Sequence, residues 1–485
     1  NYDKNWLVGY SFNTYTDTPP NGLSLMVFED GDYKFKRLEE NRHIGLLYSF
    51  AYSCISDRDG NFLYYTNGCR ILNRNCKIML NGDTINPGKV WEGDDGFYYP
   101  APNSTMFLPD PTDSHIYFLF HKRVTFNENP PDFADILYYT KIDSRLDGSL
   151  GGVVLKNKTI LSDTLNESQM AACRHANGRD WWIPIRHGVH NLYYIMLLDP
   201  DGISIHHTQR IGLDGQGYGE TYNGNAMFSP DGSKYANCTR GDKIQLFDFD
   251  RCTGYFSNPR DLVPEDSVEM AVSVCFSPDS RKLYFNDIYR LWQYDLNKAD
   301  VYGSGQLIAV WDTFTYAECC PTAFFQMRLA PDGRIYMSTF GSSNIYLHRI
   351  RYPDRSGISC DFVQRDIELP NWHDGILPYF PNYRLGPVIG SVCDSIYRIQ
   401  PETDIEIGPN PITDRLVIYT RTSYPFELEM NLEIYSLDGK LAGRHRLINQ
   451  SNRHELDLSH LPAAVYVYHL VINGDTSLSG KLVKI

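Results

Sequence analysis

Short runs of alternating apolar and polar residues, separated by turn residues, make up most of the chain. The clearest runs share one pattern: an apolar segment, a Pro-Asp-Gly or Pro-Asp-Ser turn, and then an alternating segment. They are residues 226–235 (AMFSPDGSKY), 274–284 (VCFSPDSRKLY) and 327–336 (MRLAPDGRIY). Proline presets φ in such a turn, aspartate accepts hydrogen bonds from nearby amides, and glycine readily adopts positive φ. The pattern therefore predicts pairs of antiparallel strands.

The same turn recurs along the chain at nearly regular intervals. Weaker copies precede the three clear ones, and the six equivalent positions are Asp59, Asp113, Asn177, Asp231, Asp279 and Asp332. Successive positions are 54, 64, 54, 48 and 53 residues apart, which is the length of a four-stranded β-meander with its loops. No helical apolar period persists for long, so we expect helices to be short and few.

This spacing is typical of β-propeller blades and leaves residues 6–28 and 376–395 unassigned. We expect an N-terminal strand to pair with C-terminal strands in a seventh blade, because closing the ring removes exposed sheet edges. The predicted fold is therefore all-β, with a seven-bladed β-propeller over residues 1–393. Six or eight blades stay open as alternatives, since the register is clear in only three copies.

A different pattern begins after Val392. Residues 394–408 contain four acidic residues and a proline, and we expect them to be a linker. Residues 409–485 contain short apolar runs, with hairpin turns at Asp438-Gly439 and Asn473-Gly474. The predicted strands are residues 416–420, 428–436, 441–449, 454–458, 465–472 and 477–485. The simplest fold for this pattern is a small Ig-like antiparallel β-sandwich.

The composition excludes several classes of protein. The 485 residues are 42% hydrophobic and 14% aromatic, which excludes a collagen-like or disordered chain. A formal charge of −14 argues against nucleic acid as a partner. No apolar run approaches the roughly 18 to 20 residues of a membrane helix, so we expect no membrane span. The chain begins at Asn1, and we expect that an export signal has been removed.

Eleven cysteines are too few for a disulfide scaffold, and their odd number leaves at least one unpaired within the chain. No CxxC or HExxH motif indicates a metal site, and we expect neither a metal nor a cofactor. Cys319 and Cys320 are adjacent. Because a bridge between neighbours distorts the peptide, we expect them to be separate thiols or to pair elsewhere. The remaining pairing cannot be derived from spacing.

The tail carries a series of short motifs in a fixed order. They are Pro409-Asn410-Pro411, Asp438-Gly439-Lys440, Leu461-Pro462 with Tyr466, and Lys481 in the closing GKLVKI. In this order the tail resembles the type A sorting domain of cargo of the bacterial type IX secretion system. The resemblance implies that the outer-membrane translocon and its shuttle protein recognise the tail as an export address, which is commonly cleaved off at the cell surface. Ala464 stands where the family usually has glycine. An Ig-like stalk is the alternative.

The first 390 residues carry motifs of a second kind. They are NWLVGY near the start, residues 57–82, HANGRDWWIPI (175–185), FDFDRCTGYFSNP (247–259) and LPNWHDGILPYF (369–380). They resemble a propeller family of large surface proteins linked to gliding motility and to the same export route. The resemblance implies a secreted or cell-surface protein, and the family offers no biochemical activity to carry over.

Four tripeptides look like the O-glycosylation acceptor used in proteins that pass through the periplasm of such bacteria. The acceptor residues would be Thr84, Thr164, Ser267 and Ser395. Such a triplet also occurs by chance. The serine of the predicted linker, Ser395, is the most accessible of the four.

Propellers bind ligands at the mouth of the channel, where inner strands and loops converge. The densest polar and aromatic stretch of the chain supplies our candidate ligand-binding residues, His175, Trp181, Trp182, Arg186 and His187. A histidine and an arginine beside tryptophan could bind a sugar or polarise a carbonyl. The alternative is a β-hairpin whose tryptophans pack between blades. There is no G-x-S-x-G elbow and no P-loop, and we assign no catalytic residue.

Three functions fit these observations. The first is an exported, non-enzymatic surface module that binds an unknown glycan or protein, and the absence of a convincing catalytic constellation favours it. The second is a secreted hydrolase or lyase with its site at the channel, which would need convergent acid and base groups. The third is a stable accessory of the secretion or motility machinery, which would co-purify with it at fixed stoichiometry.

Overall fold

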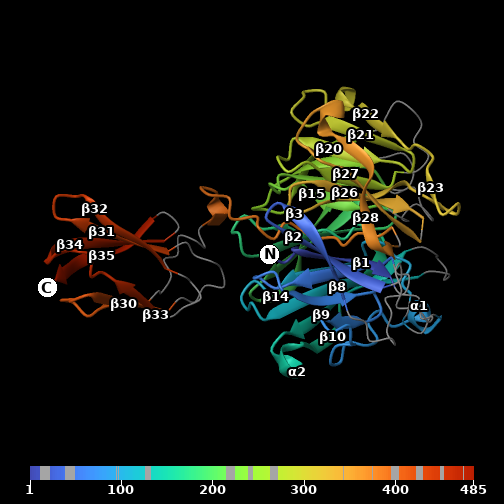
Figure 1. Ribbon diagram of the computed structural model, residues 1–485. Coiled ribbons are helices and arrows are strands. Elements are labelled where there is room, and N and C mark those ends of the chain that lie inside the picture. Colours follow the sequence, from blue (N-terminus) through green and yellow to red (C-terminus); the bar gives the residue numbers. More distant parts are fainter. Residues whose placement is uncertain are drawn as a thin grey trace. The chain divides into compact units, whose positions relative to one another are not determined.

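Alternating apolar and polar positions form strands throughout the part of the chain that the computed structural model describes, and helices are short. The described residues are 1–10, 22–38, 50–93, 96, 98–125, 133–214, 224–238, 244–262, 271–341, 343–373, 375–394, 404–421, 430–447, 453–472 and 475–485. The chain divides into two units, Asn1–Asp394 and Ser395–Ile485 (Figure 1). None of the described helices has the length and apolar character needed to cross a bilayer.

The described part of the first unit contains seven antiparallel sheets of three or four strands and one two-stranded ribbon. The first sheet is β1 (Asn5–Tyr10), β2 (Gly22–Glu29) and β3 (Asp32–Arg37), and the second is β4 (Ser53–Ser56), β5 (Phe62–Thr66) and β6 (Ile71–Asn73). The third is β7 (Thr105–Pro109), β8 (Ile116–Val124), β9 (Ala134–Asp143) and β10 (Gly152–Leu165). The fourth is β11 (Cys173–Arg174), β12 (Trp181–Arg186), β13 (Leu192–Asp199) and β14 (Gly202–Arg210).

The remaining sheets follow in the same order. The fifth is β15 (Ala226–Phe228), β16 (Lys234–Cys238), β17 (Ile244–Phe249) and β18 (Phe256–Leu262). The sixth is β19 (Ser273–Phe276), β20 (Lys282–Asn286), β21 (Arg290–Asp295) and β22 (Gln306–Val310). The seventh is β25 (Ala323–Leu329), β26 (Ile335–Phe340), β27 (Asn344–Ile350) and β28 (Phe362–His373), and β23 (Thr315–Tyr316) and β24 (Cys320–Pro321) form the ribbon. The helical turns are α1 (Lys89–Gly93), α2 (Leu146–Ser149), η1 (Tyr302–Ser304), η2 (Gly357–Cys360) and η3 (Val392–Asp394).

The repeated turn joins the first two strands of six sheets. In the clear copies, Asp231, Asp279 and Asp332 each accept a hydrogen bond from the backbone N–H two residues later, at 2.9 to 3.0 Å. Asp113 and Asn177 accept the same bond at 2.9 Å. The side chain therefore holds its own turn closed, which explains why these residue types recur at this position.

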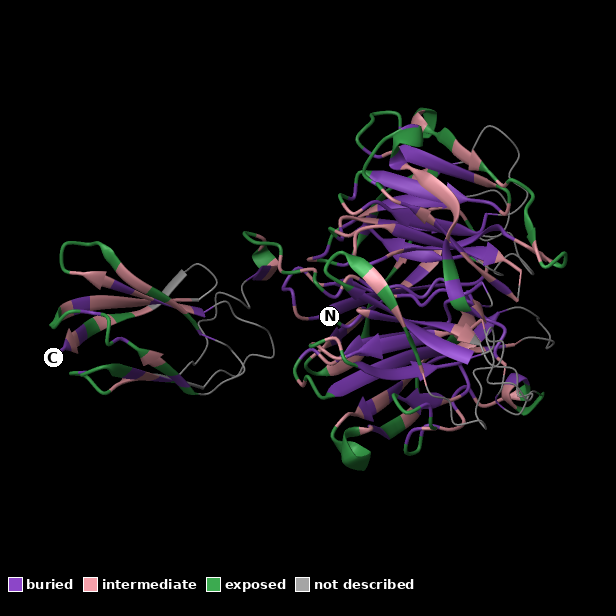
Figure 2. Ribbon diagram, in the orientation of Figure 1, coloured by how far each residue is buried: buried purple, intermediate pink, exposed green. Residues whose placement is uncertain are grey.

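Each four-stranded sheet has a buried edge and an exposed edge (Figure 2). The first strands, such as β15 and β19, are buried along their whole length, whereas the last strands, such as β14 and β22, are largely exposed. First strands of successive sheets contact one another, as β15 does β19 and β19 does β25. The first strands therefore line the interior of the unit.

The first sheet corrects the predicted shared blade. We expected an N-terminal strand to pair with C-terminal strands, but β1 pairs with β2, and β28 belongs to the seventh sheet. The N-terminal segment supplies three consecutive strands of its own, so it needs no strand from elsewhere. The end of β28 instead contacts β1 and β2, where Ser24 Oγ donates a hydrogen bond to Asn371 Oδ1 at 2.5 Å.

Two disulfides join cysteines of the first unit, and one of them contradicts our expectation. Cys252 pairs with Cys393, and the adjacent Cys319 and Cys320 pair with each other. The turn between β23 and β24, with Ala317 and Glu318 at positive φ, holds the two neighbours where their side chains meet. The other seven cysteines are buried and form no disulfide: Cys54, Cys69, Cys76, Cys173, Cys238, Cys275 and Cys360.

This pairing predicts the outcome of thiol labelling. The folded protein should take up no maleimide before reduction, because the seven cysteines outside the disulfides are buried. After mild reduction, the Cys319–Cys320 peptide should be labelled first, since Cys319 is exposed. Peptide mass spectrometry measures both, and the denatured, unreduced protein, with seven labels expected, is the control. Labels on Cys319 and Cys320 without reductant would contradict the pairing.

The second unit contains two antiparallel sheets in its described residues. One is β29 (Asp404–Gly408), β30 (Arg415–Arg421) and β33 (Arg453–Asp457), and the other is β32 (Leu441–Leu447), β31 (Met430–Ser436), β34 (Ala464–Ile472) and β35 (Asp475–Lys484). Apolar residues of both sheets, including Ile418 and Leu432, share one core. The predicted linker is too long, because residues 404–408 form β29. Its alternating Ile405 and Ile407 pair with β30, and Ile407 packs against this core.

Candidate functional site

A buried guanidinium lies where the first strands meet. Arg328 belongs to β25, in which the polar residues Gln326 and Arg328 interrupt an otherwise apolar strand, AFFQMRL. Their side chains are buried, with exposures of 0% for Gln326 and 2% for Arg328. The pairing of β25 with β26 shifts register between Phe324 and Met327, and the bond from Arg328 to Gln326 Oε1 shows that the two side chains meet. This strand therefore directs two polar side chains together into the interior.

Three oxygen atoms accept hydrogen bonds from the Arg328 guanidinium. They are Gln326 Oε1 at 3.1 Å, the Met327 carbonyl at 2.8 Å, and Asn103 Oδ1. Asn103 lies just before β7 and has φ +52°, a conformation that asparagine adopts more readily than most residues. The aromatic ring of Tyr379 lies 5.7 Å from the guanidinium. The contacts join the third and seventh sheets.

Several donors around this guanidinium have no acceptor. Arg328 Nε, Asn103 Nδ2 and Gln326 Nε2 are buried and make no hydrogen bond to any described residue. The orientation of both amides follows from their contacts, because each carbonyl oxygen accepts from Arg328 and each nitrogen is then left as a donor. Buried polar groups are normally hydrogen-bonded, so three orphaned donors in one cluster are unusual.

The positive charge of Arg328 is not neutralised by a neighbour. No carboxylate of the described residues lies within ion-pair distance of it, and burial lowers its pKa to about 10. Burying a charge without a partner is costly. The cluster is therefore rich in donors and positive charge and lacks an acceptor that carries negative charge.

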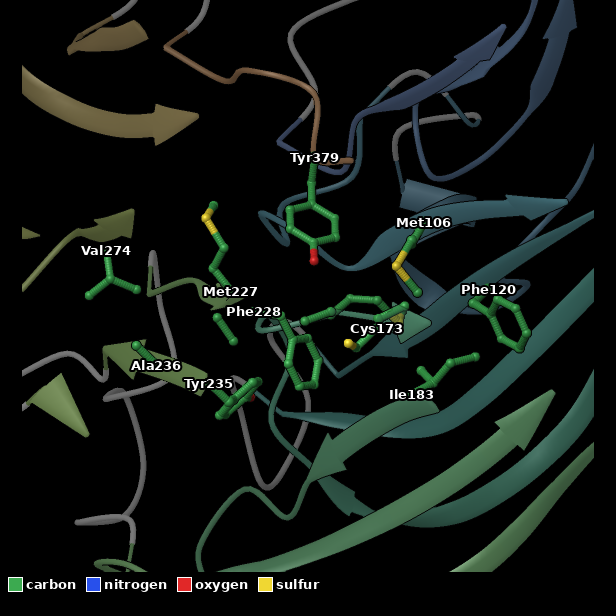
Figure 3. Close-up of a cluster of buried hydrophobic side chains, with 14 of the residues drawn as sticks. Met106, Phe120, Cys173, Ile183, Met227, Phe228, Tyr235, Ala236, Val274 and Tyr379 are labelled. Carbon is green, nitrogen blue, oxygen red and sulfur yellow. The ribbon is translucent and has the colours of Figure 1, made fainter. Parts of the chain in front are cut away.

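A cavity of about 100 Å³ adjoins this cluster. Arg328 and Tyr379 line it together with apolar side chains, among them Met227 and Phe276. Figure 3 shows Tyr379 with its hydroxyl directed toward the side chains of Cys173, Met227 and Phe228. Residues 378–382, 384 and 385 form part of the wall. The cavity has room for several water molecules or a small organic group.

The cavity offers little acid–base chemistry near neutral pH. Burial raises the pKa values of the Cys173, Cys238 and Cys275 thiols to about 12, and it also raises the pKa of Tyr379. These groups remain protonated at neutral pH, so none of them is an activated nucleophile. Among the described residues of the lining, the one carboxylate is Asp3, which pairs with Arg384 at 2.6 Å.

The five residues selected from sequence fall into two groups. Trp181 and Trp182 are buried in β12, where Trp182 Nε1 donates to the Arg251 carbonyl at 2.7 Å. The His175 ring lies 5.1 Å from Trp182, and its Nε2 is 3.1 Å from the Cys252 carbonyl. Arg174 lies 3.9 Å over the Trp181 ring. These contacts attach the fourth sheet to the turn after β17.

Arg186 and His187 lie at the opposite end of β12, about 17 Å from Trp181 at the usual rise per residue. Arg186 donates to the Leu213 carbonyl at 3.1 Å, and His187 Nδ1 accepts from the Val189 N–H at 3.0 Å. Burial lowers the pKa of His187. Because a strand separates the two groups, the structure does not gather the five residues at one point.

Sequence reasoning missed Asn103, Gln326 and Arg328. The available signal was the pair of polar residues at alternate positions of an apolar segment. Asn103 gave no such signal, since it lies 225 residues from Arg328 along the chain.

The sorting motifs of the tail lie mainly in turns and loops. Asn410 is held against β35: its amide donates to the Lys481 carbonyl at 2.7 Å, and its Oδ1 accepts from the Val483 N–H at 2.9 Å. The turn Asp438-Gly439-Lys440 joins β31 to β32, is fully exposed, and has Gly439 at φ +81°.

The Leu461-Pro462 motif lies just before β34. The Tyr466 hydroxyl donates to the Pro462 carbonyl at 2.9 Å, and the Leu461 side chain is buried. Ala464 begins β34 and pairs with Lys484. It is not among the residues of positive φ, so this position does not require the glycine that the family usually has.

Two of the four proposed glycosylation residues are described. Thr84 and Thr164 are half-buried, and the backbone N–H of each donates to the preceding aspartate, Asp83 or Asp163, at 2.8 and 2.7 Å. Ser267 and Ser395 lie outside the described residues.

Comparison with known proteins supports export. Residues 406–485 match the family described as the secretion system C-terminal sorting domain. The match supports the assignment of the chain as cargo of the type IX secretion system, carried to the cell surface or released from it. A search of curated proteins found no match.

Solved structures resemble the chain at low identity. A protein from Lactobacillus plantarum has a TM-score of 0.45 and 14% identity, with 78% of this chain and 99% of that chain covered. Periplasmic gluconolactonase from Pseudomonas aeruginosa has a TM-score of 0.42 and 14% identity, with 78% of this chain and 99% of that chain covered. The β-propeller domain of Cps50 (Swd1) from Myceliophteria thermophila has a TM-score of 0.31 and 13% identity, with 76% of this chain and 93% of that chain covered. These similarities say nothing about activity.

Proposed function

We propose that the chain is an exported β-propeller that binds a ligand at its axis and is delivered by its C-terminal domain. The observation that carries this proposal is the sorting-domain match, together with a buried donor cluster that lacks acid–base groups. In this proposal the seven sheets of the first unit are the blades. The second unit is the Ig-like address that the outer-membrane shuttle protein recognises.

Contacts between sheets support a ring. First strands contact in succession, as in β1 with β4 and β4 with β7, and the last strand β28 returns to β1. The side-chain bond from Ser24 to Asn371 links chain segments 347 residues apart. A ring closed in this way leaves only short inner sheet edges, which the neighbouring sheets protect.

The surface of the tail supports a role in recognition. Asp438 and Lys440 form an ion pair of 2.8 Å on an exposed turn, and the turn residues contribute nothing to the core of the second unit. Exposed polar residues that stabilise no core are suited to contact with a partner.

Deletion of residues 395–485 tests the proposal. The shortened chain should stay in the periplasm and still fold, because the first unit has a hydrophobic core of its own. Surface protease accessibility and cell fractionation measure the result. Full-length chain with Asp201→Ala, a change at an exposed turn, is the control and should be exported normally. Export of the shortened chain would overturn the proposed role of the tail.

A further inference from the structure

We infer that the Arg328 cluster is a binding site for a small organic carboxylate. This inference rests on the proposed binding function and names the class of ligand. It draws on three observations that are independent of the tail: an unneutralised buried charge, three orphaned donors, and an adjoining cavity.

The charge indicates a monoanion. Arg328 brings one positive charge into the interior, and its hydrogen-bond acceptors are neutral amide and peptide oxygens. A carboxylate bound beside it would neutralise this charge. A phosphate dianion would leave an unpaired negative charge of its own, since the other cation in the described lining of the cavity, Arg384, is already paired with Asp3.

The orphaned donors match the acceptor sites of a carboxylate. The two oxygens of a carboxylate offer about four lone-pair positions. Three N–H donors without an acceptor among the described residues face them in this proposal: Arg328 Nε, Asn103 Nδ2 and Gln326 Nε2. Because Nη1 and Nη2 of Arg328 already donate to protein oxygens, a bound carboxylate would accept from Nε and from the two amide nitrogens. A chloride ion would neutralise the charge but offers no planar pair of oxygens.

The cavity accounts for the rest of the ligand. Next to the charged cluster, its walls include Met227, Phe276 and Leu329, which suit a carbon skeleton. The lining also contains Arg384, whose side chain is 49% exposed while its partner Asp3 is 11% exposed. Because the Arg384 side chain is half-exposed and also lines the cavity, the cavity approaches the protein surface at Arg384.

Calorimetric titration of the full chain with sodium acetate and with sodium glucuronate tests the inference. Sodium chloride and sodium phosphate at matched ionic strength are the comparison anions. We expect saturable binding of at least one carboxylate, at least tenfold tighter than chloride or phosphate. A thermal shift that grows with carboxylate concentration should accompany it.

Two substitutions locate the site. Gln326→Met removes one orphaned donor and should weaken carboxylate binding at least tenfold, the usual range for a hydrogen bond to a charged group. Arg328→Lys keeps the charge but removes the Nε–H donor and the bonds that orient Asn103 and Gln326, and should weaken binding more strongly. The matched control is Gln293→Met: Gln293 is equally buried in β21, but its Nε2 donates to Tyr284 Oη and the Arg355 carbonyl. This control should leave carboxylate affinity unchanged.

The outcomes separate the inference from the proposed function. Equal binding of all four anions, or none, overturns the carboxylate site even if export proceeds normally. Unchanged affinity in Gln326→Met overturns it as well, and this variant decides the matter if Arg328→Lys fails to fold. Carboxylate binding by a chain that is not exported would leave the site standing and contradict only the delivery by the tail.

Discussion

Replacing Cys252 and Cys393 together by serine should lower the free energy of unfolding of the first unit by about 3–5 kcal/mol. The bridge joins residues 141 positions apart, and its loss restores much of the chain entropy of the unfolded state. It also ties η3 to the turn after β17, where Arg251 donates to the Gly386 carbonyl. Urea titration followed by tryptophan fluorescence measures the change.

The second disulfide supplies a control for this prediction. Cys319 and Cys320 are adjacent, so their bridge closes no loop, and Cys319→Ser with Cys320→Ser should change the free energy of unfolding by less than about 1 kcal/mol. Similar losses in both double variants would show that the stabilisation does not come from loop closure.

Acidification from pH 6.5 to about 4 should destabilise the first unit steeply. Burial lowers the pKa values of His121 and His348 to about 3 and that of His373 to about 4. In the unfolded chain these groups regain ordinary pKa values, so between these limits the unfolded state binds more protons than the folded state. The free energy of unfolding therefore decreases as the pH is lowered, by up to about 1.4 kcal/mol per pH unit for each histidine.

Their hydrogen bonds show why protonation is resisted. His121 lies between Asn86 Oδ1 at 2.7 Å and Thr140 Oγ1 at 2.9 Å. His348 Nδ1 accepts from the Arg365 N–H at 3.0 Å, and His373 Nδ1 accepts from the Gly375 N–H at 3.0 Å. A second ring proton would remove the bonds that His348 and His373 accept in buried places, whereas for His121 burial alone disfavours the charged ring.

Unfolding free energies at a series of pH values check this prediction. His348→Gln should reduce the slope between pH 6.5 and 4 by about 1.4 kcal/mol per unit. His115→Gln, which replaces an exposed histidine, is the matched control. A wild-type stability that is flat across this range would contradict the prediction. Depressed carboxyl pKa values, such as that of Asp366, add their own loss only below about pH 4.

The local part of the fold was accessible from sequence. The turn aspartates act through bonds to amides two residues away, so their role depends on few neighbours. The first copy shows the limit of such reasoning. Asp57, rather than Asp59, accepts the side-chain bond there, from the Asn61 N–H at 2.8 Å.

The candidate site was not accessible in the same way. Arg328 and Asn103 meet only because the third and seventh sheets converge, and no local sequence pattern predicts this contact. The stretch from His175 to His187 was predicted to bind a ligand because it is the densest polar and aromatic stretch of the chain. Trp181 and Trp182 are interior packing residues, and the two ends of β12 separate the polar groups.

The all-β class, the repeated hairpin turns and the sorting tail can be read from the chain, because strand alternation, turn chemistry and short motifs depend on neighbouring residues. Long-range packing accounts for the separate sheet of the N-terminal strands, the pairing of Cys319 with Cys320, and the burial of Arg328 among donors without acceptors in the described residues. These features depend on which distant segments pack together. For Arg328, it is the burial of the side chain, and not the residue type, that makes it a candidate for ligand binding.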